Sequence, residues 1–407
     1  MSLVINAVML CLASILGLVP LLLTARFKRQ LVLLKVRNGT PSCYHPPAAL
    51  ILPCKGLDPG FRENLRSLVG QDYPDLEFLF VVATRDDPAY GPLKELLQDL
   101  AAENPSLKAK VSVAGIKENR AQKLNNQLAA LEQISERAEV LVFVDSDARP
   151  DRGFIGRLVN PLHDPAVGAT TGYRWYHPPR PTLGSLLRST WNAGALPFLV
   201  DPKRNFAWGG AMAILRETYV KARIGEAWQN AVSDDMTFSV AVRRLGLEVR
   251  FVPQCIAVSY ETSTLAETLE FTNRQSVISR VYFPPLWWST AIGHAAANVL
   301  VLYGILSLGV WAYSGNSDYL LGSACLLLLP LQLCNAAWLF GSVRGLLPQL
   351  SRELDALRWY YVFTAPLASF LTLLNSLHAS TTRRITWRGI RYELRSPVET
   401  IVLRAED

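Results

Sequence analysis

The sequence predicts an α/β domain with a mostly parallel sheet, joined to transmembrane α-helices. Patterns typical of strands and helices alternate between about Pro46 and Arg280, as they do where helices connect parallel strands. Outside that stretch lie uncharged runs longer than the ~20 apolar residues of a spanning helix. The chain has 407 residues, 50% of them hydrophobic and only 18% charged. This composition suits one soluble domain plus a membrane part.

The chain begins with an apolar run that we expect to be a retained membrane anchor, residues 1–25. Residues 2–25 carry no charge, and a basic juxtamembrane linker, residues 26–45, follows them. A signal peptide carries its positive charges before the apolar run, so a cleaved segment is not expected. Basic residues beside a span face the cytoplasm. The sequence therefore predicts a cytosolic domain over residues 46–280.

Within that domain, short apolar runs alternate with segments whose apolar residues recur at helical spacing. We predict strands at residues 48–52, 77–83, 109–114 and 140–144, and helices at residues 61–69, 92–102 and 121–135.

The most informative motif is Asp145-Ser146-Asp147, which directly follows the apolar run of residues 140–144. In an open α/β sheet, ligands bind at the carboxyl edge of the strands. Paired carboxylates there suit a hard divalent cation, which takes oxygen ligands and keeps positions for phosphate oxygens. We therefore predict that Asp145 and Asp147 bind Mg²⁺ or Mn²⁺.

A second acidic pair, Asp234-Asp235, opens a predicted helix and supplies the candidate catalytic residues. Acidic residues at a helix start are routine caps. Ser233 or Asp234 alone would serve as the cap, which leaves Asp235 to act as a base.

Two glycines interrupt an otherwise buried run at Trp208-Gly209-Gly210. Glycines at such a place permit a ligand to approach the backbone closely, or simply form a bulge. We assign Trp208, Gly209 and Gly210 as candidates for acceptor binding.

Other polar residues at strand and helix ends are candidates for binding a nucleotide sugar. Asp86 and Asp87 follow the second predicted strand and Lys55 follows the first. These residues are therefore candidates for binding a nucleobase and ribose. The alternative is an ordinary turn, since Asp before Pro is common turn chemistry. Lys123 and Asn126 begin a helix, where they would hold a diphosphate; the alternative for Lys123 is a solvated surface residue.

The sequence lacks the motifs of several other function classes. There is no Gly-x-Gly-x-x-Gly after the first strand and no Gly-x-x-x-x-Gly-Lys-Ser/Thr, which disfavours dinucleotide-binding and nucleotide triphosphatase readings. The six cysteines are too scattered to suggest zinc ligands or a disulfide framework. No nucleic-acid partner is expected.

The C-terminal part carries three more uncharged runs, at residues 281–317, 319–343 and 359–382. They predict transmembrane helices over residues 281–382, followed by a basic tail, residues 383–407. Counting spans puts the tail outside, but its arginines favour the inside. Either one run does not fully cross, or something other than charge holds the tail.

The chain resembles the ceramide glucosyltransferases, which are membrane-anchored, family-2-like glycosyltransferases. The resemblance runs from about Lys55 to Tyr392. The segments that carry it are Lys55-Gly56-Leu57-Asp58-Pro59, Gln71-Asp72-Tyr73-Pro74, Asp86-Asp87-Pro88-Ala89, Lys123-Leu124-Asn125-Asn126, Asp145-Ser146-Asp147 and Trp387-Arg388-Gly389-Ile390-Arg391-Tyr392. It implies the nucleotide-diphospho-sugar transferase fold called GT-A.

The family pattern also implies roles for single residues. It comprises three aspartates, matched by Asp87 at the nucleotide, Asp145 at the metal and Asp235 as general base. A Gln/Arg-x-x-Arg-Trp element completes the pattern. Arg274 matches its first position, but Val277 and Ile278 stand where Arg-Trp is expected. Arg280, two residues further on, is the candidate replacement for the missing cation.

We therefore expect an inverting, metal-dependent transfer of one sugar, glucose from UDP-glucose, to the hydroxyl of a membrane lipid, ceramide. Diacylglycerol, a hopanoid or a sterol remain alternative acceptors. A processive polysaccharide synthase and a non-enzymatic membrane scaffold are the other classes. The expected location is an integral membrane protein of the bacterial inner membrane, or of the Golgi or endoplasmic reticulum in a eukaryote.

Overall fold

The computed structural model of the chain describes residues 2–38, 44–203 and 205–403. Residues 39–43 of the predicted linker, including Cys43, and residues 404–407 of the predicted tail lie outside this description. The chain divides into two compact units. The sheet unit comprises Leu31–Pro179, Phe198–Glu261 and Arg383–Asp407, and the helical unit comprises Met1–Gln30, Arg180–Pro197 and Thr262–Thr382.

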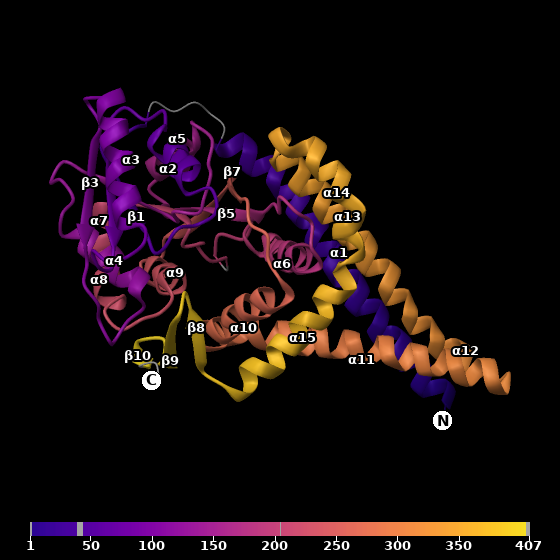
Figure 1. Cartoon of the computed structure of the whole chain (residues 1–407). Coiled ribbons are helices and arrows are strands. Elements are labelled where there is room, and N and C mark those ends of the chain that lie inside the picture. The colour runs from indigo at the N-terminus through magenta and orange to yellow at the C-terminus, as the bar shows by residue number, and fades with distance from the viewer. Residues whose placement is uncertain (1, 39–43, 204, 404–407) are drawn as a thin grey trace. The chain divides into compact units, whose positions relative to one another are not determined.

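A seven-stranded mixed sheet forms the centre of the sheet unit, in the order β3-β2-β1-β4-β6-β5-β7 (Figure 1). All its neighbouring pairs are parallel except the two that β6 makes, which confirms the predicted mostly parallel sheet. The strands are β1 (Ala48–Pro53), β2 (Leu76–Val82), β3 (Lys108–Val113), β4 (Val140–Val144), β5 (Val167–Tyr176), β6 (Ala211–Leu215) and β7 (Glu248–Ser259).

Helices pack against both faces of this sheet, because successive strand side chains point to opposite faces. On one face, Leu50 and Val142 share a core with Leu65 and Phe154. On the other, the Phe143 ring meets the Trp228 ring edge-on at 5.3 Å. The helices of this unit are α2 (Phe61–Val69), α3 (Tyr90–Glu103), α4 (Gln122–Leu131), α5 (Phe154–Val159), η1 (Asn160–His163), α7 (Arg216–Lys221), α8 (Ile224–Ala227) and α9 (Asp234–Arg244).

The C-terminal tail folds as a small antiparallel sheet that belongs to the sheet unit. Its strands are β8 (Arg384–Trp387), β9 (Ile390–Ser396) and β10 (Glu399–Leu403). Tyr392 and Leu394 are buried. The Tyr392 hydroxyl accepts a hydrogen bond from the Gln122 backbone N–H at 3.2 Å.

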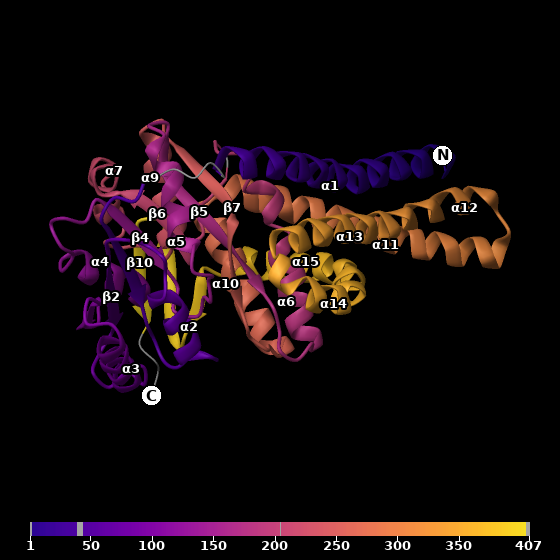
Figure 2. The ribbon, with the colours of Figure 1, turned by 90° about the horizontal axis from the view of Figure 1, so that it is seen from above.

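The helical unit is built from long apolar helices, of which α1, α11 and α13 run side by side (Figure 1 and Figure 2). Three stretches are long and apolar enough to cross a membrane: Val4–Leu34, Pro284–Ser314 and Ser317–Leu346. The helices are α1 (Ser2–Asn38), α6 (Leu183–Ala193), η2 (Leu196–Phe198), α10 (Leu265–Tyr282), α11 (Pro284–Ser314), α12 (Ser317–Ser323), η3 (Ala324–Leu327), α13 (Leu328–Leu346), η4 (Pro348–Leu350), α14 (Ser351–Phe363) and α15 (Ala365–Thr381). Helix α1 starts in this unit and continues past its boundary at Gln30.

The last predicted span, residues 359–382, differs from the prediction in shape. It is split between α14 and α15, whose axes differ by 58°. Pro366 lies in the first turn of α15, where a proline starts a helix well but cannot continue the preceding one. This pair forms either a broken span or a re-entrant loop.

Candidate functional site

The site lies at the carboxyl ends of neighbouring parallel strands. Strand β1 pairs with β2 on one side and β4 on the other, so the loops after all three strands meet at one edge. Asp145 follows β4, Asp87 follows β2 and Lys55 follows β1. The local cause is the burial of Val140–Val144, which anchors the strand and leaves the first polar residue at its end.

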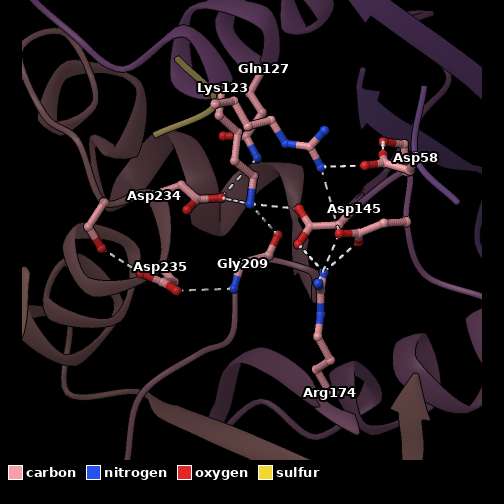
Figure 3. Close-up of polar contacts among 12 residues, drawn as sticks. Asp58, Lys123, Gln127, Asp145, Arg174, Gly209, Asp234 and Asp235 are labelled. Carbon is pink, nitrogen blue, oxygen red and sulfur yellow. Dashed lines mark hydrogen bonds and ion pairs between the residues drawn. The ribbon is translucent and has the colours of Figure 1, made fainter. Parts of the chain in front are cut away.

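Both carboxylates of Asp145-Ser146-Asp147 bind the guanidinium of Arg174, which projects from β5 (Figure 3). The Nη2 atom of Arg174 lies 2.8 Å from Asp145 Oδ2 and 2.6 Å from Asp147 Oδ1. Its guanidinium carbon also lies 5.0 Å from the centre of the Trp208 ring, a cation–π contact. The side chain of Arg174 is only 7% exposed, so both carboxylates are held in a largely dry site.

Lys123, in the first turn of α4, joins the two acidic pairs. Its Nζ lies 2.8 Å from Asp145 Oδ1, 2.9 Å from Asp234 Oδ2 and 3.1 Å from the Gly209 carbonyl oxygen (Figure 3). Burial pulls the pKa of Lys123 down, but the two carboxylates outweigh it and hold the pKa above its usual value. Lys123 is therefore an ion-paired cation and not the solvated surface residue of the alternative reading.

Asp235 is oriented by donors around the start of α9. Ser233 is the helix cap, because its side chain accepts the Met236 backbone N–H. The Asp235 carboxylate accepts from the Gly209 N–H at 3.3 Å, from the Met236 N–H at 2.8 Å and from the Ser233 hydroxyl. Burial, and then the charge of Asp234, raise the pKa of Asp235 to about 6. A carboxyl group with that pKa is ionised at neutral pH yet remains basic enough to accept a proton.

The two glycines before β6 let the chain's own carboxylates approach the backbone. A Cβ atom on Gly210 would lie 2.1 Å from Trp208 Cζ2 and 2.5 Å from Asp145 Oδ2, and one on Gly209 would lie 2.6 Å from Asp234 Oδ1. None of these distances is possible without a shift of the carboxylate and, at Gly210, of the Trp208 ring as well. Trp208 lies beside them against Arg174, so all three acceptor candidates border the carboxylates.

The loops after β1 and β2 hold each other. Asp87 Oδ1 accepts the backbone N–H of Gly56 at 2.8 Å and that of Ala89 at 3.0 Å. Asp87 therefore forms an ordinary turn, which was the alternative to nucleotide binding, and it also positions the loop that carries Lys55. Burial lowers the pKa of Lys55 below its usual value, which Asp87 partly opposes. Asp86 is exposed beside them.

Asn126 is buried, and its amide is used within the protein. It donates to the Val81 carbonyl at 3.1 Å and accepts from the Gln122 side chain at 2.8 Å. These bonds fix α4 against the end of β2, so Asn126 positions Lys123.

Arg274 and Arg280 lie on α10 in the helical unit. The Arg274 guanidinium carbon lies 5.4 Å from the Phe271 ring centre. Arg280 donates to the carbonyl oxygens of Ala379 and Thr382, at the end of α15. Val277 and Ile278, which replace Arg-Trp, are buried.

Sequence reasoning did not assign site roles to Arg174 and Asp58, which the structure places in ion pairs with Asp145 and with Arg388 of the tail. Asp58 Oδ2 accepts from the Ser146 hydroxyl at 3.2 Å, and Asp58 Oδ1 lies 2.8 Å from Arg388 Nη2. Arg174 carried a usable signal, since it stands inside the fully buried strand Val167–Tyr176 and a buried charge needs a partner.

Ion pairs of 3.8 Å or less connect these groups into one network, the carboxylate–cation cluster. It contains Asp58, Asp145, Asp147, Asp234, Glu261, Lys123, Arg174 and Arg388. In the described part of the chain, five carboxylates thus face three cations. The remaining negative charge and the all-oxygen donor set of Asp145 and Asp147 fit a hard divalent cation. Among the described residues, no group of three or more His, Cys, Asp or Glu is arranged to hold a metal.

Comparison with known proteins places most of the chain in one family. The model of "Glycosyl transferase family 21" matches residues 9–399. Among solved structures, a mannosyltransferase from Pyrobaculum calidifontis in complex with GDP-Man and Mn²⁺ is 18% identical, with 90% of this chain and 98% of that chain covered and a TM-score of 0.45. Glucosyl-3-phosphoglycerate synthase from Mycobacterium tuberculosis is 16% identical, with 60% and 80% covered and a TM-score of 0.35.

Proposed function

The chain belongs to glycosyl transferase family 21 and is a membrane-associated glycosyltransferase of the predicted GT-A fold, and on that premise we propose its reaction. It transfers one glucose from UDP-glucose to the hydroxyl of a membrane lipid, ceramide. The observation that carries this proposal is the position of Lys123, which joins Asp145 of the candidate donor site to Asp234, next to the candidate base Asp235.

The chain's own cations bind the donor diphosphate. Lys123 and Arg174 border Asp145 and are largely buried, so their charges act in a site of low water content, where electrostatic interactions are stronger. A Mg²⁺ or Mn²⁺ ion bound by Asp145 and Asp147 would supply Lewis-acid stabilisation of the leaving diphosphate. Lys55, Asp86 and Asp87 hold the uridine end.

Asp235 takes the proton from the lipid hydroxyl. The oxygen attacks the anomeric carbon from the face opposite the diphosphate, the carbon–oxygen bond to the diphosphate breaks, and the proton passes to the Asp235 carboxylate. A single displacement inverts the configuration, so the product of an α-linked donor is β-linked. Gly209 and Ser233 keep the carboxylate oriented by their hydrogen bonds.

The tail determines how the chain crosses the membrane. It belongs to the sheet unit, since Tyr392 binds Gln122 and the Val402 N–H donates to the Glu118 carbonyl at 2.9 Å. Thr262–Thr382 therefore leaves and returns to one side of the membrane and crosses it an even number of times. Its two long apolar stretches meet this condition, so the bent pair α14–α15 is re-entrant.

This topology puts the tail's arginines on the same side as the basic residues after α1, the cytosolic side. The membrane is the bacterial inner membrane or, in a eukaryote, that of the Golgi or endoplasmic reticulum. An epitope added after Asp407 should be detected only when the membrane is permeabilised. Detection in intact cells or spheroplasts would contradict a re-entrant pair.

The reaction is tested by transfer of radiolabelled glucose from UDP-glucose to a panel of lipids by the reconstituted full chain. We expect a single-sugar ceramide product that requires Mn²⁺ or Mg²⁺. Asp235→Asn should lower turnover by about 10²–10⁴-fold, the usual contribution of a general base, and leave UDP binding intact. Transfer to diacylglycerol, a hopanoid or a sterol, and not to ceramide, would show that the acceptor is that lipid and would overturn the ceramide assignment. Elongated products would indicate a synthase, and an absence of UDP binding would indicate a scaffold.

A further inference from the structure

Arg388 lies at the tip of the hairpin between β8 and β9, in the C-terminal tail. Trp387 pairs with Ile390, so Arg388 and Gly389 are the two residues of the turn. Both have positive φ, 48° for Arg388 and 77° for Gly389. Such turns favour Asn, Asp or Gly, so an arginine with positive φ is strained there. Strain of this kind persists where surrounding contacts enforce it, often at functional sites.

The hairpin is held against the site at several points. The Tyr392 hydroxyl binds the N–H of Gln122, the residue before Lys123. At the tip, Arg388 Nη1 donates to the Lys55 carbonyl at 2.7 Å, and Nη2 donates to Asp58 Oδ1 at 2.8 Å. The position of Arg388 is thus fixed by the two segments that carry the candidate donor-binding lysines.

The guanidinium also faces the predicted metal-binding pair. Arg388 Nη2 lies 3.8 Å from Asp147 Oδ2. The two hydrogen bonds to Lys55 and Asp58 use only part of the N–H donors of a guanidinium. The side chain is 39% exposed, so a ligand entering the site from solvent can reach it.

A diphosphate is the ligand that this arrangement fits. Arginine binds phosphate oxygens through paired, charge-assisted N–H donors. The Gln/Arg-x-x-Arg-Trp element has lost its second arginine, and Arg280 is committed to the carbonyl oxygens at the end of α15. Arg388 is an arginine that the structure places directly at the carboxylate–cation cluster of the sheet unit.

We propose that Arg388, carried to the site by the C-terminal hairpin, binds the diphosphate of the nucleotide-sugar donor. This inference rests on the proposed function, because it requires a nucleotide diphosphate at Asp145 and Asp147. It gives the C-terminal tail a part in donor binding, although some 240 residues separate Arg388 from Asp147. The tail is thereby a component of the active site and not only a membrane-flanking extension.

The test is isothermal titration of UDP, and separately of uridine, into the full chain in lipid nanodiscs with Mn²⁺. Arg388→Gln keeps the side-chain length and removes the charge. We expect it to weaken UDP binding by about tenfold to a hundredfold, as for the loss of a charge-assisted hydrogen bond. Uridine, which has no diphosphate, should bind both proteins equally. Arg388→Lys should recover part of the lost UDP affinity.

Arg391→Gln is the matched control, since it removes the same charge from an exposed position of the same hairpin. It should bind UDP as the unmodified chain does. Equal or tighter UDP binding by Arg388→Gln would overturn the inference, and so would an equal loss of uridine and UDP affinity. If the unmodified chain binds no UDP with Mn²⁺, the proposed function fails first, so the two failures are distinguishable.

Discussion

The two units of this protein differ in the kind of polar side chain that they bury. In the sheet unit the buried polar network is ionic, and Lys123 and Arg174 connect Asp145 to Asp234 and Asp147. In the helical unit, contacts between helices include neutral pairs: Thr24 donates to Asn335 at 2.8 Å, and Asn375 donates to Asn273 at 2.8 Å. The charged contacts there include Arg280 with the carbonyl oxygens at the end of α15 and the exposed ion pair between Arg344 and Asp355.

This difference follows from what surrounds each unit. A charge in hydrocarbon is expensive, whereas neutral hydrogen bonds can join membrane helices at little cost. A charged network in the sheet unit is also costly to bury, so it needs complete pairing or a charged ligand. The contrast indicates that the buried charged side chains of the sheet unit bind a ligand, whereas the neutral polar side chains of the helical unit pack its helices together.

The strongest way to break the ionic network is Lys123→Met. It leaves Asp145 and Asp234 without their shared cation, and removing one partner of a buried ion pair costs about 3–5 kcal/mol. We expect a large fall in thermal stability of the purified chain, measured by intrinsic fluorescence. Lys110→Met, at an exposed position on β3, should change stability by less than about 0.5 kcal/mol. Equal effects of the two variants would contradict a buried network.

Gly210→Ala tests the network through its geometry and keeps every charge. The new Cβ would lie 2.1 Å from Trp208 Cζ2 and 2.5 Å from Asp145 Oδ2, so both the ring and the carboxylate must move. We expect a loss of about 1–3 kcal/mol in stability, typical of overpacking, together with weaker Mn²⁺-dependent UDP binding. Gly91→Ala in α3 is the control, because nothing lies within 4 Å of its new Cβ. Normal UDP binding by Gly210→Ala would show that the tight packing of Trp208 and Asp145 against Gly210 is unimportant for binding.

The pH dependence of turnover sharpens the contrast further, because burial raises the pKa of Asp235 to about 6. A base acts in its deprotonated form, so turnover should rise with pH, reach half its maximum near pH 6 and then level off. Below that pH it should fall about tenfold per unit. A profile that stays flat from pH 7 down to pH 4 would exclude Asp235 as the titrating base.

The smallest effect is expected in the helical unit. Thr24→Val removes the hydrogen bond to Asn335 and keeps the shape of the side chain. Hydrogen bonds between membrane helices contribute about 0.6 kcal/mol on average, so stability should fall only slightly. A loss as large as that of Lys123→Met would mean that the two units do not differ in the way described.

The sequence predicted the parts of the molecule that depend on local patterns. The strand at residues 140–144 and the helix at residues 61–69 have the expected bounds, because apolar spacing and flanking turn residues are local signals. The position of Arg388 beside Asp58 depends on a contact across 330 residues and on a turn geometry that disfavours arginine. The bend between α14 and α15 was likewise not predicted, since a count of apolar residues contains no information on the direction of a helix axis.

The central claim is that the carboxylate–cation cluster is the donor site, and metal-dependent UDP binding tests it most directly. Titration of UDP into the full chain should show binding with Mn²⁺ that chelation abolishes. Asp147→Asn should abolish this binding. The control is Asp75→Asn, just before β2, whose carboxylate pairs with Lys108; it should leave the binding unchanged. Undiminished Mn²⁺-dependent binding by Asp147→Asn would contradict the account.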